Sequence, residues 1–296
     1  MTKLRPDLSN TPIQVGPLPG WITTGSAESL EDAAFRSGAA LAYLHMISGQ
    51  EAVPQALWRD RLALAAAEVC VGFSGRREGQ FALRDALHLT RLGDHPGPAG
   101  AIFAQWSRAV ARPISVAHLG KVMDGVSAER IALCLDARGS NPVGAAAGVI
   151  EAVLADLPRA ETAALILADA ALAKSMAREH ILPLMSLGLK PRELRLRGDA
   201  LRLACHRAVV AGAGQAVPLA ADLARRATRL RDVMPQLRAK AAERAVDLFL
   251  SQDAVAPAAL ATLMSDRAAR RLCDRLVDLG AVRELTGRDS FRLYGV

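Results

Sequence analysis

The chain has 296 residues, of which 51% are hydrophobic and 23% charged; this composition indicates a globular protein with a buried core and excludes extensive disorder. The 37 Lys and Arg residues outnumber the 30 Asp and Glu residues, and the formal net charge of +7 permits an anionic partner. The start of the chain lacks the apolar stretch of a secretory signal, and charged residues interrupt the longer apolar runs, so we expect a cytoplasmic protein without membrane contact.

Aromatic residues make up only 4% of the chain while Ala and Leu are abundant, which favours helices packed closely through small side chains. We therefore predict an all-α protein: a multi-helix bundle body and a C-terminal segment with one small β-hairpin. An N-terminal arm, residues 1–25, precedes a helical domain over residues 26–112. Its helices are expected at 29–48, 54–73 and 78–92, with a fourth ending near Ala111 before Pro113.

The second predicted domain, residues 113–234, is an alanine-rich helical bundle. Helices are expected at 142–157, 161–181, 199–212 and 215–233, separated by glycine and proline. The basic segment 188–198 is predicted to be a solvated loop, with a surface arm or a linker as the alternative.

The last predicted domain, residues 235–296, has the order of elements of a winged helix-turn-helix. Helices are expected at 241–250, 257–263 and 266–279, and strands at 282–285 and 291–294 around a turn. Ser265 is the expected N-cap of the third helix, and Gly280 the residue that ends it. Because two short strands are marginally stable alone, we expect Phe291 to anchor the hairpin on the helices.

The third helix of this domain sorts into two faces at about 100° per residue. One face carries apolar residues from Ala269 to Leu279, and the other carries arginines that can contact phosphates or a guanine edge. We predict a DNA-binding protein or transcriptional regulator whose DNA contacts are Arg267, Arg270, Arg271, Arg275, Arg283, Arg288 and Arg292. Since such modules often bind two half-sites as dimers, a homodimer is expected. The alternative for this module is protein docking with solvated arginines.

A second group of polar side chains lies among apolar residues on the N-terminal helices. It contains Arg59, Glu68, Glu78, Arg84, Asp85 and His88, together with Arg61, Arg76 and Arg77. These residues form either a salt-bridge network that fastens the helices, which we favour, or a ligand pocket. A pocket would make the protein an enzyme or a ligand-binding protein, with the C-terminal domain used for protein contact.

The chain contains no recognisable catalytic motif, so we predict no catalytic residue, no metal and no cofactor. The glycine-rich stretch 93–100 lacks the Lys-Ser/Thr pair of a P-loop, and Cys205 and His206 are adjacent and so diverge on a helix. The cysteines lack the paired spacing of a zinc site or a disulfide framework, and we predict buried thiols at Cys70, Cys134, Cys205 and Cys273.

Residues 32–41, 58–64 and 83–86, the loop 93–100 and the closing stretch 283–295 resemble an uncharacterised bacterial family, the domain-of-unknown-function 1403 family. This resemblance spans nearly the whole chain and implies no activity. Residues 74–79, SGRREG, are also similar to the inhibitory Ser-x-x-x-Glu-Gly motif of Fic-domain adenylyl transferases. Their catalytic His-Pro-Phe and Gly-Asn-Gly-Arg loop is absent from the sequence, so adenylyl transfer is not expected.

Overall fold

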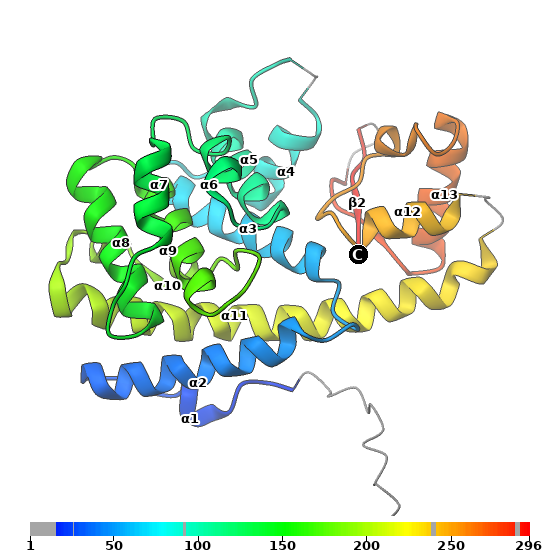
Figure 1. Cartoon of the computed structure of the whole chain (residues 1–296). Helices are drawn as coiled ribbons and strands as arrows, with labels where there is room; N and C mark the ends of the chain where they lie inside the picture. The colour runs from blue at the N-terminus through cyan, green and yellow to red at the C-terminus, as the bar shows by residue number, and fades with distance from the viewer. Residues whose placement is uncertain (1–15, 26, 91–92, 238–240, 288–290) are drawn as a thin grey trace, which may run out of the picture.

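The computed structural model describes residues 16–25, 27–90, 93–237, 241–287 and 291–296. The described chain is mostly helical, and its β-structure is one two-stranded antiparallel hairpin and an isolated bridge, which confirms the all-α class. We call residues 16–237 the body and the described residues from 241 to 296 the C-terminal module. In Figure 1 the module lies at one end of the body.

The elements of the body are α1 (Gly20–Thr23), α2 (Leu30–Ser48), α3 (Gln55–Phe73), α4 (Gln80–His88), α5 (Gly97–Ala111), α6 (Val116–Gly120), α7 (Ala128–Leu135), α8 (Pro142–Asp156), α9 (Glu161–Ser175), α10 (Met185–Gly188), η1 (Glu193–Arg195), α11 (Gly198–Val233) and η2 (Met234–Gln236). The module contains α12 (Ala242–Phe249), η3 (Pro257–Leu260), α13 (Asp266–Asp278), β1 (Arg283–Glu284) and β2 (Tyr294–Gly295).

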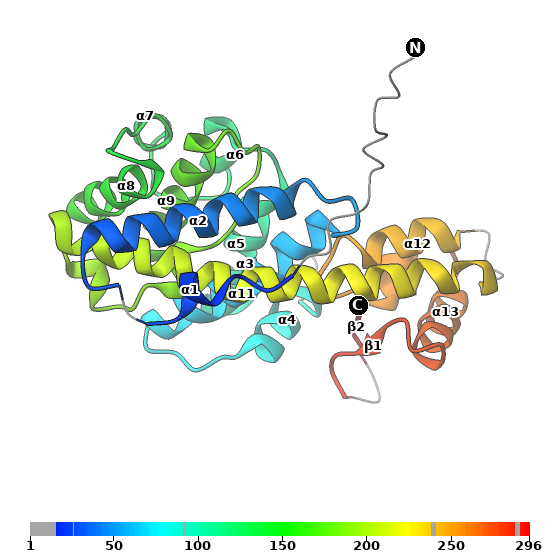
Figure 2. The ribbon, with the colours of Figure 1, turned by 90° about the horizontal axis from the view of Figure 1, so that it is seen from below.

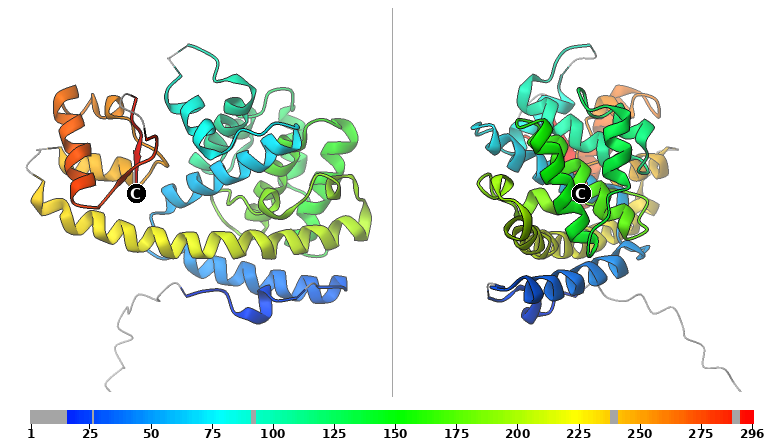
Figure 3. Two further views of the ribbon diagram at one scale, coloured as in Figure 1. Left: turned by 180° about the vertical axis from the view of Figure 1, so that it is seen from behind. Right: turned by 60° about the vertical axis from the view of Figure 1, so that its left-hand side comes forward.

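The longest helix, α11, is continuous, so the predicted break between residues 212 and 215 is wrong. Glycine and Pro218 weaken a helix locally, but packing along α11 overrides that tendency. Gly212 serves this packing, because a Cβ there would lie 2.7 Å from the Leu184 carbonyl oxygen. The views agree that α2 runs beside α11, with α1 and α2 outermost on that side (Figures 2 and 3).

A second difference concerns α9, which ends at Ser175 instead of continuing to residue 181. The helix is terminated by Ala177, whose φ of 53° is left-handed, and the Arg178 amide then donates to the Ala173 carbonyl. The basic segment 188–198 is also more ordered than a solvated loop, since it contains η1 and buries Leu189 and Leu194.

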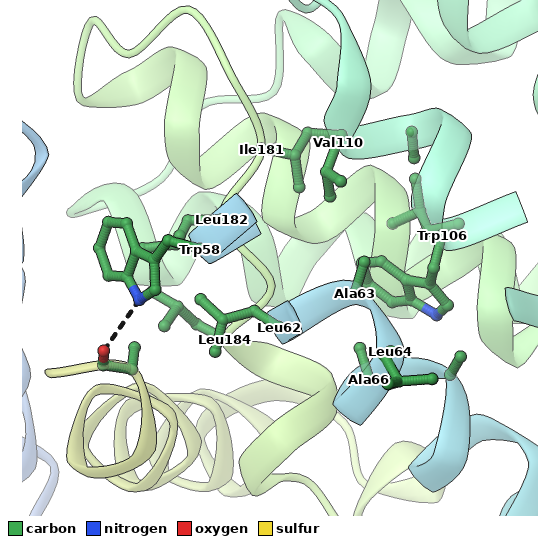
Figure 4. Packing of buried hydrophobic residues seen from close by; sticks show 14 of the residues in the cluster. Trp58, Leu62, Ala63, Leu64, Ala66, Trp106, Val110, Ile181, Leu182 and Leu184 are labelled. Carbon is green, nitrogen blue, oxygen red and sulfur yellow. Dashed lines mark hydrogen bonds between the residues drawn. The ribbon is translucent and has the colours of Figure 1, made fainter. Parts of the chain in front are cut away.

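One contiguous core of buried side chains extends from the N-terminal helices to the C-terminal module. Figure 4 shows Trp58 and Trp106 within it; the indole nitrogen of Trp58 donates to the Ala216 carbonyl at 2.9 Å. The four cysteines are all buried and free, as predicted, and burial raises the pKa of the Cys70 thiol to about 12. Among the described helices, none is both long and apolar enough to cross a membrane.

Candidate nucleic-acid interface

The C-terminal module joins three chain segments through its hairpin. β1 and β2 pair antiparallel, with Glu284 opposite Tyr294. On the other side of β2, Val255 and Tyr294 exchange two backbone hydrogen bonds of 2.8 and 3.0 Å. The segment that links α12 to η3 is thereby attached to the hairpin that follows α13.

The amphipathic pattern of α13 is reproduced in the structure. Ser265 caps the helix through the Ala268 amide, and Gly280 follows its end with a φ of 63°. The buried face consists of Ala269, Leu272, Cys273 and Leu276. This face packs into the core, which leaves the opposite face to solvent.

The exposed face of α13 carries the predicted arginines. Within the described part of the chain, no carboxylate lies within ion-pair distance of Arg267, Arg271 or Arg275, which are all exposed. Arg270 differs, because its guanidinium pairs with Asp266 at 3.0 Å. The helix also carries Asp274 and Asp278, so its four arginines face three aspartates and the net charge is +1.

The remaining predicted DNA contacts lie on the hairpin. Arg283 is exposed to solvent as a whole, although partial burial of its guanidinium lowers its pKa. Arg292 is half-buried and lies 3.7 Å from Glu284, and a hydrogen bond with Tyr294 raises its pKa. Arg288 lies outside the described residues.

Phe291 does not anchor the hairpin, because its side chain is 75% exposed. The alternating pattern predicted a strand at residues 291–294. In the structure β2 begins at Tyr294, and Phe291 precedes it with a left-handed φ of 56°. The anchors are Leu285 and Leu293, which are buried together with Ala254 in a small cluster of their own.

The fold brings only some residues of the predicted polar cluster together. Arg61 and Arg84 meet at the buried carboxylate of Asp253, a residue of the module. Asp253 is fully buried, and its carboxylate accepts hydrogen bonds from Nε of Arg84 at 2.5 Å and from Nη2 at 3.1 Å. The Arg61 guanidinium pairs with the same carboxylate, and its Nη2 also donates to the carbonyl oxygens of Asp253 and Val296. Two helices of the body therefore converge on one residue of the module.

Asp60 joins this network by binding the backbone amide of Asp253. Its carboxylate accepts the Asp253 amide at 2.9 Å and the Ser107 hydroxyl at 2.7 Å. Burial raises the pKa of Asp60, and these hydrogen bonds oppose that effect. Asp60 and Asp253 were not among the predicted site residues. Asp60 lies between Arg59 and Arg61, which were predicted in the cluster, but no local pattern indicates Asp253, which lies 169 residues from Arg84.

Arg59, Glu68 and Glu78, which were predicted in the same cluster, have partners outside the network of Asp253. Arg59 donates to the Val110 carbonyl, Glu68 accepts from Gln80, and Glu78 pairs with Arg76 at 3.2 Å on the surface. Asp85 is half-buried on α4. The Fic-like stretch, residues 74–79, follows the end of α3 and contains the pair of Glu78 with Arg76.

His88 lies at the end of α4, where burial lowers its pKa and the nearby Asp253 and Asp60 oppose that shift. Its Nε2 atom is buried and has no hydrogen-bond partner among the described residues. The residue also lines a cavity of about 630 Å³ between α4 and the module. The other polar side chains of this cavity are Thr90, Asp266, Arg270, Asp274, Arg292 and Tyr294.

Comparison with known proteins gives a family without an assigned activity. No curated protein matches this chain. A family model does match, and it covers almost the full length, in agreement with the resemblance noted in the sequence. The chain belongs to the family described as "Protein of unknown function (DUF1403)", whose model matches residues 6–296.

Proposed function

We propose that this protein binds DNA through its C-terminal module and acts as a transcriptional regulator, with α13 entering the major groove. The observation that carries this proposal is the exposed row of Arg267, Arg271 and Arg275 on a helix whose opposite face is buried. A helix fixed in this way can present guanidinium groups to phosphates and base edges without unfolding.

The arrangement of the module supports this function. The order α12, Val255 bridge, η3, α13 and hairpin supports the proposal of a winged helix-turn-helix, in which α13 would be the helix that reads the major groove. From Arg267 to Arg275 the helix rises about 12 Å at 1.5 Å per residue. That length is close to the major-groove width of about 12 Å. In this proposal Arg283 and Arg292 on the hairpin contact the DNA phosphates beside the groove.

Replacing Arg267, Arg271 and Arg275 together by alanine is expected to weaken DNA binding by at least about 100-fold, since each arginine contact to a base contributes about 1–3 kcal/mol. The fold should persist because the three side chains are exposed. Fluorescence anisotropy with labelled duplex DNA measures the affinity, and circular dichroism melting measures the fold. Undiminished binding by a folded triple variant would contradict the role of α13.

Two controls separate this role from general charge. R192A/R195A/R225A removes the same positive charge from exposed positions of the body and should change affinity only a few-fold. Asp278→Asn removes a carboxylate from the arginine face of α13 and should tighten binding. If both triple variants weaken binding equally, the attraction is non-specific and α13 has no special role.

A second candidate function, binding of a small molecule, is favoured by the cavity beside His88. Its volume is within the range of about 300–1,000 Å³ that is usual for ligand sites. Arg84 does not line this cavity, because its guanidinium is directed to Asp253. A ligand here would therefore contact α13, the hairpin and His88, and not the other members of the predicted N-terminal cluster.

A further inference from the structure

We propose that the outer face of α2 is a self-association surface, on which a second copy of this chain packs its own α2 in the antiparallel direction. This inference concerns the face of the body formed by α1 and α2, and it does not depend on DNA binding by the C-terminal module.

The inner face of α2 is fixed on the body. Ala33, Ala40 and Leu44 are buried there, and the Ser37 hydroxyl lies 2.7 Å from Nδ1 of His206 on α11, both residues being buried. Ser37 and His206 therefore join the two helices across 169 residues of sequence. Since α1 and α2 are outermost on this side (Figures 2 and 3), the other face of α2 is bordered by α1 and is covered by no further helix of the described chain.

From Phe35 to Met46 the outermost residues of that face are apolar, and the exposed Glu31 borders them one turn before Phe35. Phe35 is 68% exposed, Met46 is 50% exposed, and Trp21 of α1, 53% exposed, lies with its ring centroid 5.5 Å from that of Phe35. The sequence from Ser37 to Ser48 contains no Asp, Glu, Lys or Arg. A solvated helix normally carries charged residues on its outer side, and contiguous apolar patches of this kind mark interaction surfaces.

The order of residues along this face makes it complementary to itself. In an antiparallel pair with its two-fold axis between Ala40 and Leu41, Phe35 of one copy meets Met46 of the other at both ends. In the middle, Ala39 meets Ala42, while Tyr43 lies at the border of this face, where its hydroxyl donates to the Gly16 carbonyl at 2.9 Å. Small residues at the centre allow the helices to approach closely, while each end pairs an aromatic ring with a thioether. A two-fold interface requires this property, because the same patch must match itself.

The area is sufficient for a weak dimer. Large aromatic side chains bury about 150–250 Å² each, so Trp21, Phe35 and Met46 at their observed exposure offer roughly 400 Å² per copy. Both copies with the intervening small residues then bury about 1,000 Å², which is near the lower limit for a specific interface. We expect a dissociation constant in the micromolar range, with no covalent or metal link.

Sedimentation velocity of the full-length protein over about 1–100 µM, the range expected for such an area, tests this surface. The wild type should shift from monomer to dimer. Phe35→Glu and Met46→Glu should each weaken the dimer at least about 100-fold, because each change occurs twice in a two-fold interface and each side chain buried is a large apolar contribution. Leu133→Glu on α7, where the leucine is also 68% exposed, is the matched control and should leave dimerisation unchanged.

A pair of double variants tests the antiparallel register. F35K/M46E places opposite charges together at both ends of the interface and should dimerise more tightly than F35E/M46E, which places like charges there. A wild type that stays monomeric throughout the range overturns the proposal. So does a dimer that survives Phe35→Glu and Met46→Glu, or one that treats the two double variants alike.

Discussion

Replacing Asp253 with alanine is expected to destabilise the protein by about 3–5 kcal/mol, the usual effect of removing one partner of a buried ion pair. Arg61 and Arg84 both direct their guanidinium groups to this carboxylate, and Asp253 is fully buried. Its loss leaves two cations without their shared partner, since neither arginine can reach water freely. Urea unfolding followed by circular dichroism measures the free energy of unfolding.

The matched control for this change is Asp222→Ala on α11. Asp222 pairs with Arg225 and Arg226 at 3.1 and 2.7 Å, and its side chain is 36% exposed whereas that of Asp253 is fully buried. Exposed pairs contribute about 0–1 kcal/mol, so the control variant should be close to the wild type in stability. Equal losses in the two variants would show that Asp253 does not fasten the module to the body.

The stability of the protein is also expected to fall as the pH rises from about 4 to 8, because of Asp169. Burial raises the pKa of this carboxyl from 3.8 to about 8, although the Leu184 and Met185 amides donate to it at 3.2 and 3.1 Å. The folded state therefore keeps a proton that the unfolded chain releases. Its stabilising contribution is complete below pH 3.8 and lost as the pH approaches 8, by up to about 6 kcal/mol at roughly 1.4 kcal/mol per pKa unit.

Asp169→Asn isolates this effect from other titrating groups. Urea unfolding of wild type and variant between about pH 5 and 8 gives two stability curves, and their difference should change by roughly 1.4 kcal/mol per pH unit, the slope for one proton. The wild type should lose stability relative to the variant as the pH rises. A difference that stays constant over this range would mean that Asp169 does not hold a proton in the folded protein.

Local signals in the sequence were sufficient to predict many helices of the body and α13. Pro142 begins α8 after the Asn141 cap, and Ser265 begins α13, because capping and proline act over a few residues. The same kind of reasoning failed for α11, where Gly212 indicated an end to the helix. Its effect there depends on Leu184, a contact that only the tertiary fold creates.

In the candidate site, too, features set by the local sequence were predicted, and features set by tertiary contacts were not. The two faces of α13 follow from helical periodicity and were predicted residue by residue. The position of Phe291 was not, because an alternating pattern of two short strands does not fix where pairing begins. The partner of Arg84 could not be predicted either, since nothing in the sequence around Asp253 indicates that this residue is buried against α3 and α4.

DNA binding through α13 is tested most directly by the affinity for mixed-sequence duplex DNA across a salt series. If about four phosphates are neutralised, the slope of log K against log salt should be near −3.6. The slope should become much shallower when Arg267, Arg271 and Arg275 are replaced together by alanine. No binding at low salt, or the same slope in the triple variant, would contradict DNA recognition by this helix.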